Sequence, residues 1–389
     1  MFKAAYHLCG SIIEKPYLFT DGKATNVVTP VSLLEIKVTL PSRIIFSCET
    51  NCSKYDPSEL AHSPNVKLGG GILGPLFKVV LNSGSIVAVR RFRKGIVKPT
   101  ELDNCIGFFS QINGRLLLAI LFSFWYGEEA FVAYRYLCLG SLEELLHGRE
   151  GIQFTPLNWE IRCHIALCAS LAVASIHSQV SKEGEPLVCG VIKASNILIQ
   201  VDFSACLGGY ETPYLIPSHV LIKRNPGSVA PELIDSEKSS DVFTQKSDVY
   251  SFGILLLQLI TGKKPMLCDG HREVMLVDYV KFKKKEVGMQ GIYDEKLLEV
   301  EDSITNIVEI AELCLLQNPN ERPTMDRVVQ MFQELQHKYS NAHTMKVCLI
   351  NSTCLKPVYV FDIFFKDSAV VEQHCNYFLS FRKISTVLL

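Results

Sequence analysis

A small polar island separates two aliphatic runs near the middle of the chain. Residues 187–199 read LVCGVIKASNILI, and the island begins at Lys193 and ends at Asn196. A Lys and an Asn three residues apart can hold a phosphate group and a metal ion. The residues just before Lys193 are Cys, Gly, Val and Ile, and none of them can accept a proton from a substrate hydroxyl. The island therefore has phosphate-binding residue types but lacks a general base.

A second phosphate-binding pattern lies earlier in the chain. Gly69, Gly71 and Gly74 form a Gly-x-Gly-x-x-Gly sequence between two predicted strands. A dinucleotide-binding fingerprint would lead into a helix instead. The strand–turn–strand setting suits a loop whose backbone N–H groups cover nucleotide phosphates. Taken alone, three glycines are equally consistent with a tight turn.

Two different kinds of element must position these patterns. The first part of the chain predicts a small, mostly antiparallel sheet with one helix: strands within 68–92, 116–126 and 130–137, and a helix over 99–113. The later part has apolar residues at helical spacing, which predicts helices over 159–178, 246–260, 304–317 and 324–336. A sheet-rich half followed by a helical half predicts an α+β fold with two lobes.

Further motifs follow the glycines in a fixed order. They are VAVRR, the Lys193–Asn196 island, Ala230-Pro231-Glu232, SDVYSFG and Glu321-Arg322-Pro323. In this order and spacing, the chain resembles a eukaryotic protein kinase domain. The segments GSLEELLHG, QKSDVYSFGILLLQLITGKKP and NPNERPTM are most similar to plant leucine-rich-repeat receptor-like kinases.

The resemblance implies a bilobal protein-kinase-like fold, with a small β-rich N-lobe and a larger α-helical C-lobe. The kinase-like domain is expected over residues 60–340, with the N-lobe at about 60–136 and the C-lobe at about 137–340. Residues 1–59 and 341–389 are expected to be extensions of unassigned role, although 31–40 and 43–48 have strand-like composition.

The resemblance also implies that the catalytic residues are missing. Val191 stands at the position of the catalytic base, while Lys193 and Asn196 are retained. Arg90 stands where the family has a phosphate-binding Lys, and a forked guanidinium does not replace an ammonium group at a tight site. Cys105 falls at the position of the Glu that pairs with this Lys, with Glu101 and Asp103 as close neighbours in sequence.

The metal-binding motif is altered as well. Counting forward from Asn196 places Gly209 where the family has its metal-binding Asp, and Glu211 would serve only after a shift. Residues 201–203, VDF, lie too close and fit a turn between short strands. A single Asn is a poor Mg²⁺ site. Mg²⁺ binding is therefore not expected, and any ATP binding is expected to be weak, through Leu68, Gly69, Gly71, Gly74, Ala88, Arg90, Tyr136 and Leu137.

The structural markers of the family are present. The resemblance implies that Glu232 pairs with Arg322 and that Asp248 braces the catalytic loop. Each could be an ordinary surface charge by itself, but their order favours an intact frame for the C-lobe.

The leading hypothesis is an inactive receptor-like kinase, a pseudokinase that acts by binding other proteins in signalling, receptor-like kinases among them. Two alternatives stay open: a weakly active Ser/Thr kinase that uses displaced residues, and an ATP-binding switch without phosphoryl transfer. The intact glycine pattern favours nucleotide entry, whereas Arg90 and the missing metal carboxylate oppose tight binding of Mg–ATP.

Composition limits the setting. A net charge of −1 gives no reason to expect a nucleic-acid partner. The 14 cysteines lack regular spacing and indicate buried thiols in a reducing compartment. The uncharged stretch 163–181 is long enough to span a membrane, but its Ala, Ser and His content favours a core helix. A cytoplasmic location is expected, with membrane association through partners; Lys281, Lys283, Lys284 and Lys285 could touch an anionic membrane face or simply be a solvated helix face.

Overall fold

The computed structural model describes residues 45–46, 60 and 63–340, apart from 94, 113, 127–128, 149–156, 235–241, 270–271 and 298–300. The chain divides into two compact units, Met1–Phe332 and Gln333–Leu389. Most of the expected extensions 1–59 and 341–389, including the strand-like segment 31–40, lies outside the described residues, so the limits at 60 and 340 stay predictions.

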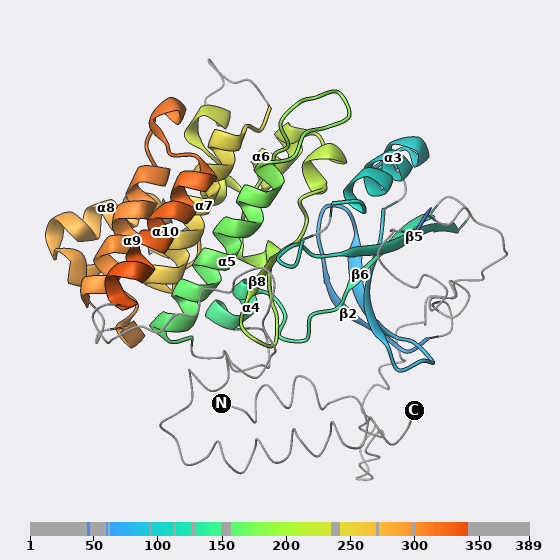
Figure 1. The fold of residues 1–389 in the computed structure, drawn as a ribbon, viewed down its shortest axis with the longest axis horizontal. Coiled ribbons are helices and arrows are strands. Elements are labelled where there is room, and N and C mark those ends of the chain that lie inside the picture. Colours follow the sequence, from blue (N-terminus) through green and yellow to red (C-terminus); the bar gives the residue numbers. More distant parts are fainter. Residues whose placement is uncertain are drawn as a thin grey trace, which may run out of the picture. The chain divides into compact units, whose positions relative to one another are not determined.

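The N-terminal part of the first unit is an antiparallel sheet (Figure 1), as expected for the strands predicted within 68–92, 116–126 and 130–137. Its strand order is β1-β5-β6-β4-β3-β2. The strands are β1 (Ile45–Phe46), β2 (Asn65–Gly70), β3 (Pro75–Val80), β4 (Ile86–Arg91), β5 (Ile120–Tyr126) and β6 (Glu129–Arg135). Val79, Val87, Val89 and Phe131 join a buried apolar cluster on this sheet. The register sets Ala88 of β4 opposite Tyr134 of β6, a pair that matters for the site below.

One helix, α3 (Pro99–Phe109), lies beside the sheet (Figure 1). Pro99 opens the helix, where the missing N–H costs nothing. Leu102, Ile106 and Phe109 are buried, and their spacing of four and three residues puts them on one face. Cys105 lies next to this face, so α3 directs that side chain inward as well.

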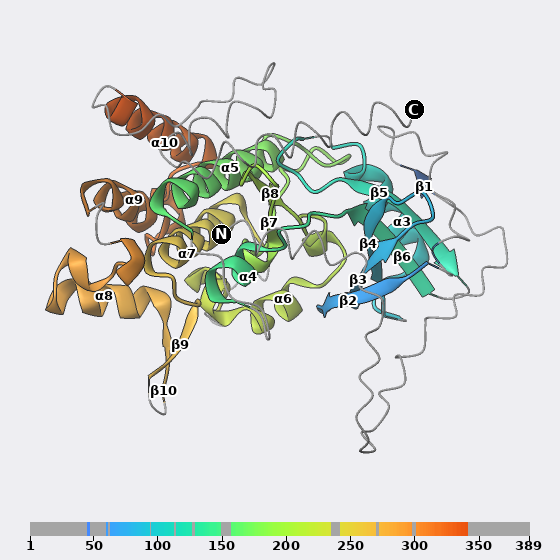
Figure 2. The same cartoon turned by 90° about the horizontal axis from the view of Figure 1, so that it is seen from below.

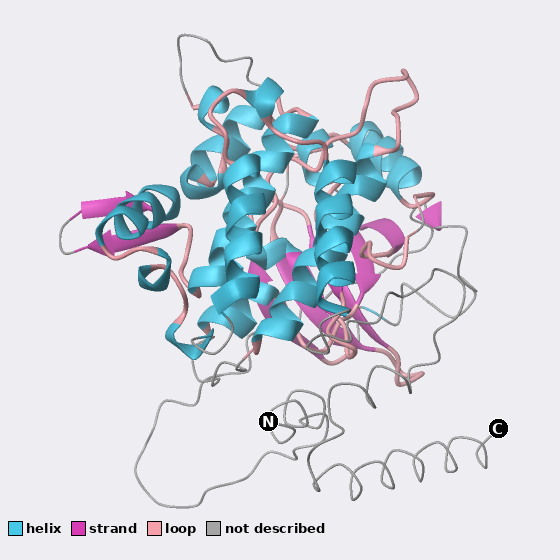
Figure 3. Ribbon diagram, turned by 60° about the vertical axis from the view of Figure 1, so that its left-hand side comes forward, coloured by secondary structure: helices cyan, strands magenta, loops and turns pink. Residues whose placement is uncertain are grey.

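The rest of the first unit is mainly helical. Figure 2 shows its helices on one side and the sheet on the other, and Figure 3 views its helices with strands behind them. Its helices are α4 (Leu142–His147), α5 (Trp159–His177), α6 (Ser218–Arg224), α7 (Gln245–Thr261), α8 (Leu276–Glu286), α9 (Glu301–Cys314) and the start of α10 (Met325–Ser340). Two short antiparallel pairs accompany them: β7 (Ile197–Ile199) with β8 (Ala205–Leu207), and β9 (Met266–Asp269) with β10 (Arg272–Met275). The expected division into a β-rich and a helical part is confirmed.

Helix α5 explains the apolar stretch that resembles a membrane span. It is the one helix of the described residues with the length and composition to cross a membrane, but 72% of that window is buried inside the protein. Asn158 caps its N-terminus by accepting a hydrogen bond from the Ile161 N–H. Within it, His164 and Cys168 are buried and in contact at 3.7 Å, so they contribute to packing.

Helix α7 forms the centre of the helical part, and every residue from Ser247 to Thr261 is buried. Thr244 and Ser247 form a capping box at its start, and Gly262 ends it in the left-handed conformation. A Cβ on Gly253 would lie 2.8 Å from the Leu315 side chain, because the chain passes very close to α7 there. This rigid helix carries Asp248, which reaches the catalytic-loop region.

Candidate functional site: a kinase-like site without its carboxylates

The polar island lies in a turn that leads into β7. Val191, at the position predicted for the base, is 8% exposed and apolar. Lys193 donates a hydrogen bond from Nζ to Asn225 Oδ1 at 3.1 Å. Burial lowers the pKa of the Lys193 ammonium, and the Glu143 charge opposes this effect. Lys193 is thus tied to the segment after α6 by a hydrogen bond that needs no substrate.

Asn196 closes the turn and lies against Gly209. The Asn196 carbonyl accepts a hydrogen bond from the Gly208 N–H at 2.8 Å. A Cβ on Gly209 would lie 3.1 Å from Asn196 Nδ2, and Gly209 has a φ of +75°. A side chain at 209 would therefore be strained and would crowd the amide. Asn196 and Gly209 do meet, but they offer a cation one amide oxygen and no carboxylate.

The glycine-rich turn between β2 and β3 is closed on itself. Gly71 and Gly74 exchange hydrogen bonds, N–H to carbonyl, at 3.2 and 3.3 Å. Both N–H groups therefore already have acceptors within the turn. Gly74 has a φ of +137°, and a Cβ there would lie 2.0 Å from the Arg91 carbonyl oxygen. Only glycine fits at this close approach of β3 to β4.

Arg90 on β4 points to the same turn. Its Nη1 donates to the Gly74 carbonyl at 3.1 Å, and a Cβ on Gly71 would lie 3.7 Å from that nitrogen. No ion pair within 4.0 Å is recorded for Arg90 in the described part of the chain. The guanidinium at the position of the family's phosphate-binding Lys is therefore held by a backbone carbonyl of the glycine-rich turn.

The remaining positions expected for nucleotide binding border this region. Leu68 lies at a β-bulge between Lys67 and Gly69, and Ala88 is 7% exposed. Tyr136 and Leu137 are half-buried after β6, and the Lys78 Nζ stands 5.2 Å from the centre of the Tyr136 ring.

Glu211 lies in the centre of the site and is 2% exposed. Its Oε1 accepts a hydrogen bond from the Tyr134 hydroxyl at 2.9 Å, and its Oε2 is buried without a hydrogen-bond partner among the described residues. Burial raises the pKa of the Glu211 carboxyl, while the Tyr134 bond and the Arg90 charge oppose the rise. The Cys105 Sγ of α3 lies 3.9 Å from the Glu211 backbone oxygen. A carboxyl group is thus buried next to the position where the helix has Cys105 in place of Glu.

Aromatic packing fixes the segment that carries Glu211. The ring of Phe109, at the end of α3, lies 5.7 Å from that of Tyr210 and 5.0 Å from that of Tyr214. The Tyr210 hydroxyl donates to the Leu118 carbonyl at 2.9 Å. The short 3-10 turn Thr212–Tyr214 follows Glu211 directly. Residues 210–214 are therefore packed against the C-terminal end of α3.

Residues 201–203 form a turn between β7 and β8, as expected from the sequence. Asp202 accepts hydrogen bonds from the Ser204 N–H and hydroxyl, at 3.0 and 2.6 Å, and pairs with Arg115 at 3.2 Å. Phe203 has a φ of +61°. Asp202 is occupied within its own turn.

Asp248 connects α7, α5 and the catalytic-loop region. Its fully buried carboxylate accepts, through Oδ2, a hydrogen bond from the Cys189 N–H at 2.6 Å and contacts His177 Nε2 at 2.9 Å. Burial raises the pKa of the Asp248 carboxyl, and His177 opposes the rise. Ligand atoms of His177, Cys189 and Asp248 lie within 4.8 Å of one another. Because Oδ2 is already engaged twice, we interpret this cluster as a brace of the loop.

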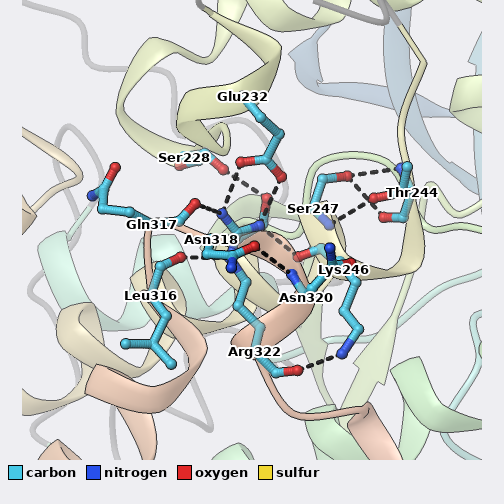
Figure 4. A network of polar contacts seen from close by, with 11 residues as sticks. Ser228, Glu232, Thr244, Lys246, Ser247, Leu316, Gln317, Asn318, Asn320 and Arg322 are labelled. Carbon is cyan, nitrogen blue, oxygen red and sulfur yellow. Dashed lines mark hydrogen bonds and ion pairs between the residues drawn. The ribbon is translucent and has the colours of Figure 1, made fainter.

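Glu232 and Arg322 form a clamp in the helical part (Figure 4). Arg322 Nη1 and Nη2 each donate to one Glu232 carboxylate oxygen at 2.7 Å. The same guanidinium donates to the carbonyls of Leu316, Lys246 and Gln317, and its carbon stands 4.9 Å from the centre of the Tyr250 ring. The Arg322 side chain has 0% exposure and that of Glu232 27%. We call this pair, with its carbonyl partners, the Arg322 clamp.

Two members of the site were not identified from the sequence. Tyr134 and Asn225 supply the hydrogen bonds to Glu211 and Lys193. Tyr134 carried a usable signal, because a Tyr inside an apolar strand must place its hydroxyl against a polar partner. Asn225 carried none, since nothing in its neighbourhood distinguishes it from an ordinary turn residue.

The lysine run lies on α8, as expected for a helix face. Lys281 and Lys285 are exposed, and Lys284 pairs with Glu312 of α9. Phe282 is 54% exposed beside them. Because one of the lysines is neutralised by a neighbouring helix, we favour a solvated face for this run.

The glycine-rich strand pair, the polar island before β7 and the Arg322 clamp together define the architecture of a protein kinase domain. The chain belongs to this family: a family model described as "Protein tyrosine and serine/threonine kinase" matches residues 64–332.

Within the family, the chain is similar to plant receptor kinases. One relative named a probable inactive receptor kinase, from Arabidopsis thaliana, is 31% identical over 323 residues, covering 81% of this chain and 48% of the relative. A second of that name and organism is 33% identical over 290 residues, covering 72% and 43%. A leucine-rich-repeat receptor-like protein kinase of Arabidopsis thaliana is 31% identical, covering 77% and 46%. The chain spans about half the length of these relatives.

Solved structures give the same assignment. The pseudokinase domain of BIR2, described as an immune regulator of the RLK/Pelle family, has a TM-score of 0.57 and 27% identity, covering 70% of this chain and 82% of that chain. The kinase domain of maize SIRK1, bound to AMP-PNP, has a TM-score of 0.65 and 25% identity, covering 75% and 99%. The predicted bilobal kinase fold is confirmed.

Proposed function

We propose that this chain is a pseudokinase domain of the receptor-like kinase type, which acts in signalling by binding other proteins and transfers no phosphate. The observation that carries the proposal is the absence of carboxylates from the two family positions that need them. Val191 and Gly209 cannot accept a proton or ligate a metal, and Asn196 packs against Gly209. Positioned acid–base help is typically worth about 10²–10⁴ in rate. The relatives named as inactive receptor kinases support this proposal.

Nucleotide binding, in this proposal, is weak and nearly independent of Mg²⁺. Gly71 and Gly74 use their N–H groups within the turn, and Arg90 is held by the Gly74 carbonyl. A nucleotide phosphate that binds to these N–H groups or to Arg90 must first break the contacts they already make. The alternative of an ATP-binding switch is favoured by the kinase fold and by the AMP-PNP bound to the maize neighbour.

The partners we propose are other proteins of receptor-kinase signalling, at the cytoplasmic side of the plasma membrane. The proposed working unit is the domain from about residue 60 to 340. The contacts of Asp248 and the Arg322 clamp would keep the binding surfaces of this domain in place, and neither contact requires catalytic activity.

Two measurements test the proposal. Incubation with labelled ATP and either Mg²⁺ or Mn²⁺ should give no incorporation above a heat-killed control, into the protein itself or into a basic substrate. Incorporation that is lost in Asn196→Ala would establish the weakly active kinase instead. A thermal-shift titration with ATP, with and without Mg²⁺, should give a small stabilisation in both series; a large Mg²⁺-dependent one would mean that the metal motif is misplaced, with Glu211 and Asp202 the first residues to examine.

A further inference from the structure

We propose that His177, Cys189 and Asp248 bind a borderline-soft divalent cation such as Zn²⁺, at the point where α5, the loop before β7 and α7 meet. Their ligand atoms lie within 4.8 Å of one another, the one such group of three His, Cys, Asp or Glu side chains among the residues that the structure describes. The proposal goes beyond the proposed function, since it needs neither nucleotide nor phosphate transfer.

The three side chains offer the donor atoms that zinc takes in proteins. Imidazole nitrogen, thiolate sulfur and carboxylate oxygen are its usual ligands, whereas Mg²⁺ prefers oxygen alone. Cys189 is 4% exposed and Asp248 0% exposed, so the net charge of the complex matters. A thiolate and a carboxylate together balance a divalent cation, which makes the buried complex neutral. Donor type and charge therefore both favour a zinc-class cation.

One carboxylate oxygen of Asp248 is open to the cation. Its Oδ1 is buried and has no hydrogen-bond partner among the described residues. Its Oδ2 accepts a hydrogen bond from the Cys189 N–H at 2.6 Å and contacts His177 Nε2 at 2.9 Å. A buried acceptor without a partner costs free energy, and a cation bound at Oδ1 removes this cost. The Cys189 N–H on Oδ2 would then orient the ligating carboxylate.

The protein holds the three ligands together without help from an ion. His177 is the last residue of α5, and Asp248 lies in the first turn of α7, which a capping box fixes. Gln245 joins the elements, because its Nε2 donates to the His177 carbonyl at 2.9 Å and to the Leu187 carbonyl at 3.0 Å. Ligands that are positioned in advance lose little conformational freedom on binding.

Binding exchanges protons for the cation and needs no oxidant or reductant. Burial raises the pKa of the Cys189 thiol, so the cation displaces the thiol proton to solvent and takes the sulfur electron pair. The His177 imidazole binds through Nε2 and carries its proton on Nδ1, which exchanges its contact with Asp248 Oδ2 for a bond to the cation. The His177 side chain is 9% exposed and the exposed residues 178–180 follow it, so the ion enters from that side.

The test titrates the reduced full chain with Co²⁺ and then displaces it with Zn²⁺. The parent should bind a single tight equivalent with a sulfur-to-cobalt charge-transfer band, and Cys189→Ser should lose both. At about 100 times its dissociation constant, Zn²⁺ should raise the melting temperature of the parent by about 5–10 °C and leave that of Cys189→Ser unchanged. Cys168→Ser is the matched control, because Cys168 is also buried and lies 3.7 Å from a histidine, His164, but has no place in the group of three. It should behave as the parent does.

His177→Gln keeps an N–H donor for Asp248 and takes the place of Cys189→Ser if that variant fails to fold, as judged by its melting curve. A parent without the charge-transfer band, a variant that keeps it, or a control that loses it overturns the proposal. If neither variant folds, X-ray absorption at the zinc edge of the parent decides. One sulfur with nitrogen and oxygen ligands supports the site, and coordination without sulfur or by sulfur alone overturns it. No phosphate transfer is measured, so each result leaves the proposed function as it stands.

Discussion

Replacing Arg322 by alanine is expected to lower the free energy of unfolding by about 3–5 kcal/mol, the usual cost of breaking a buried ion pair. The 27% exposure of Glu232 lets water reach the carboxylate that is left behind, which moves the electrostatic part toward the lower end. The three backbone carbonyls that lose their donor at Leu316, Lys246 and Gln317 move it upward again, because each unsatisfied buried group costs about 1–3 kcal/mol. This loss is a large part of the roughly 5–15 kcal/mol that stabilises a domain.

The assay is a melting curve of Arg322→Ala beside the parent. With a shift of about 2–4 °C for each kcal/mol in a domain of this size, the melting temperature should fall by on the order of 10 °C. Arg327→Ala, at an exposed arginine in the first turn of α10, is the matched control and should stay within about 0.5 kcal/mol of the parent. Lys193→Ala loses only the bond to Asn225, worth about 0.5–1.5 kcal/mol. Equal, small shifts for Arg322→Ala and Lys193→Ala would refute the view that the clamp supports the helical part.

Three further variants test separate features. Gly74→Ala should destabilise the protein by about 1–3 kcal/mol, because its Cβ would lie 2.0 Å from the Arg91 carbonyl oxygen. The control Gly69→Ala should have little effect, because no atom lies within 4 Å of a Cβ at that position. Similar melting curves for the two variants would contradict the close approach at Gly74. The Glu211 pKa is raised above its usual 4.5, so the folded state holds the proton more strongly and the free energy of unfolding falls as the pH rises above about 4.5. Glu211→Gln should remove that decline. Parallel curves of stability against pH for the variant and the parent would contradict this prediction. Burial lowers the His147 pKa to about 4, so the unfolded state binds the proton first on acidification; His147→Leu should reduce the loss of stability between about pH 6.5 and pH 4, measured by denaturant titration.

The positions of strands and helices were largely predictable, because burial on one face imposes a period. The stretch 324–336 has apolar residues at spacings of three and four residues, which predicts a helix. Helix α10 does begin at Met325, and the Thr324 hydroxyl accepts a hydrogen bond from the Arg327 N–H. Weaker periodicity over 99–113 predicted the right element with a wrong end, since α3 stops at Phe109. Helix ends depend on a few terminal hydrogen bonds, so a pattern read from sequence fixes them poorly.

The contents of the site were less predictable, since they depend on contacts between distant residues. The departures from the kinase-family pattern at Val191, Gly209 and Arg90 could be seen directly in the sequence. The burial of Glu211 against Tyr134 could not, because it joins residues 77 apart through the packing of α3. The hydrogen bond from Lys193 to Asn225 could not be seen for the same reason, because it joins residues 32 apart. Side chains released from one role take new partners that only the folded structure defines.

The Arg322 clamp also sets an order of events during synthesis. Its two charged partners are 90 residues apart, and both α5 and α7 are complete in the chain before Arg322 is added. At about 5–20 residues per second, Glu232 waits roughly 5–18 seconds for its partner. During that interval α7 lacks the later segments that pack against it, which are α8, α9 and the turn Pro319–Glu321, so its apolar surface is open to chaperones and to aggregation. The pairing of Glu232 with Arg322 therefore cannot begin before the ribosome has reached residue 322, and codon changes that slow translation between these two residues lengthen that interval without changing the amino-acid sequence.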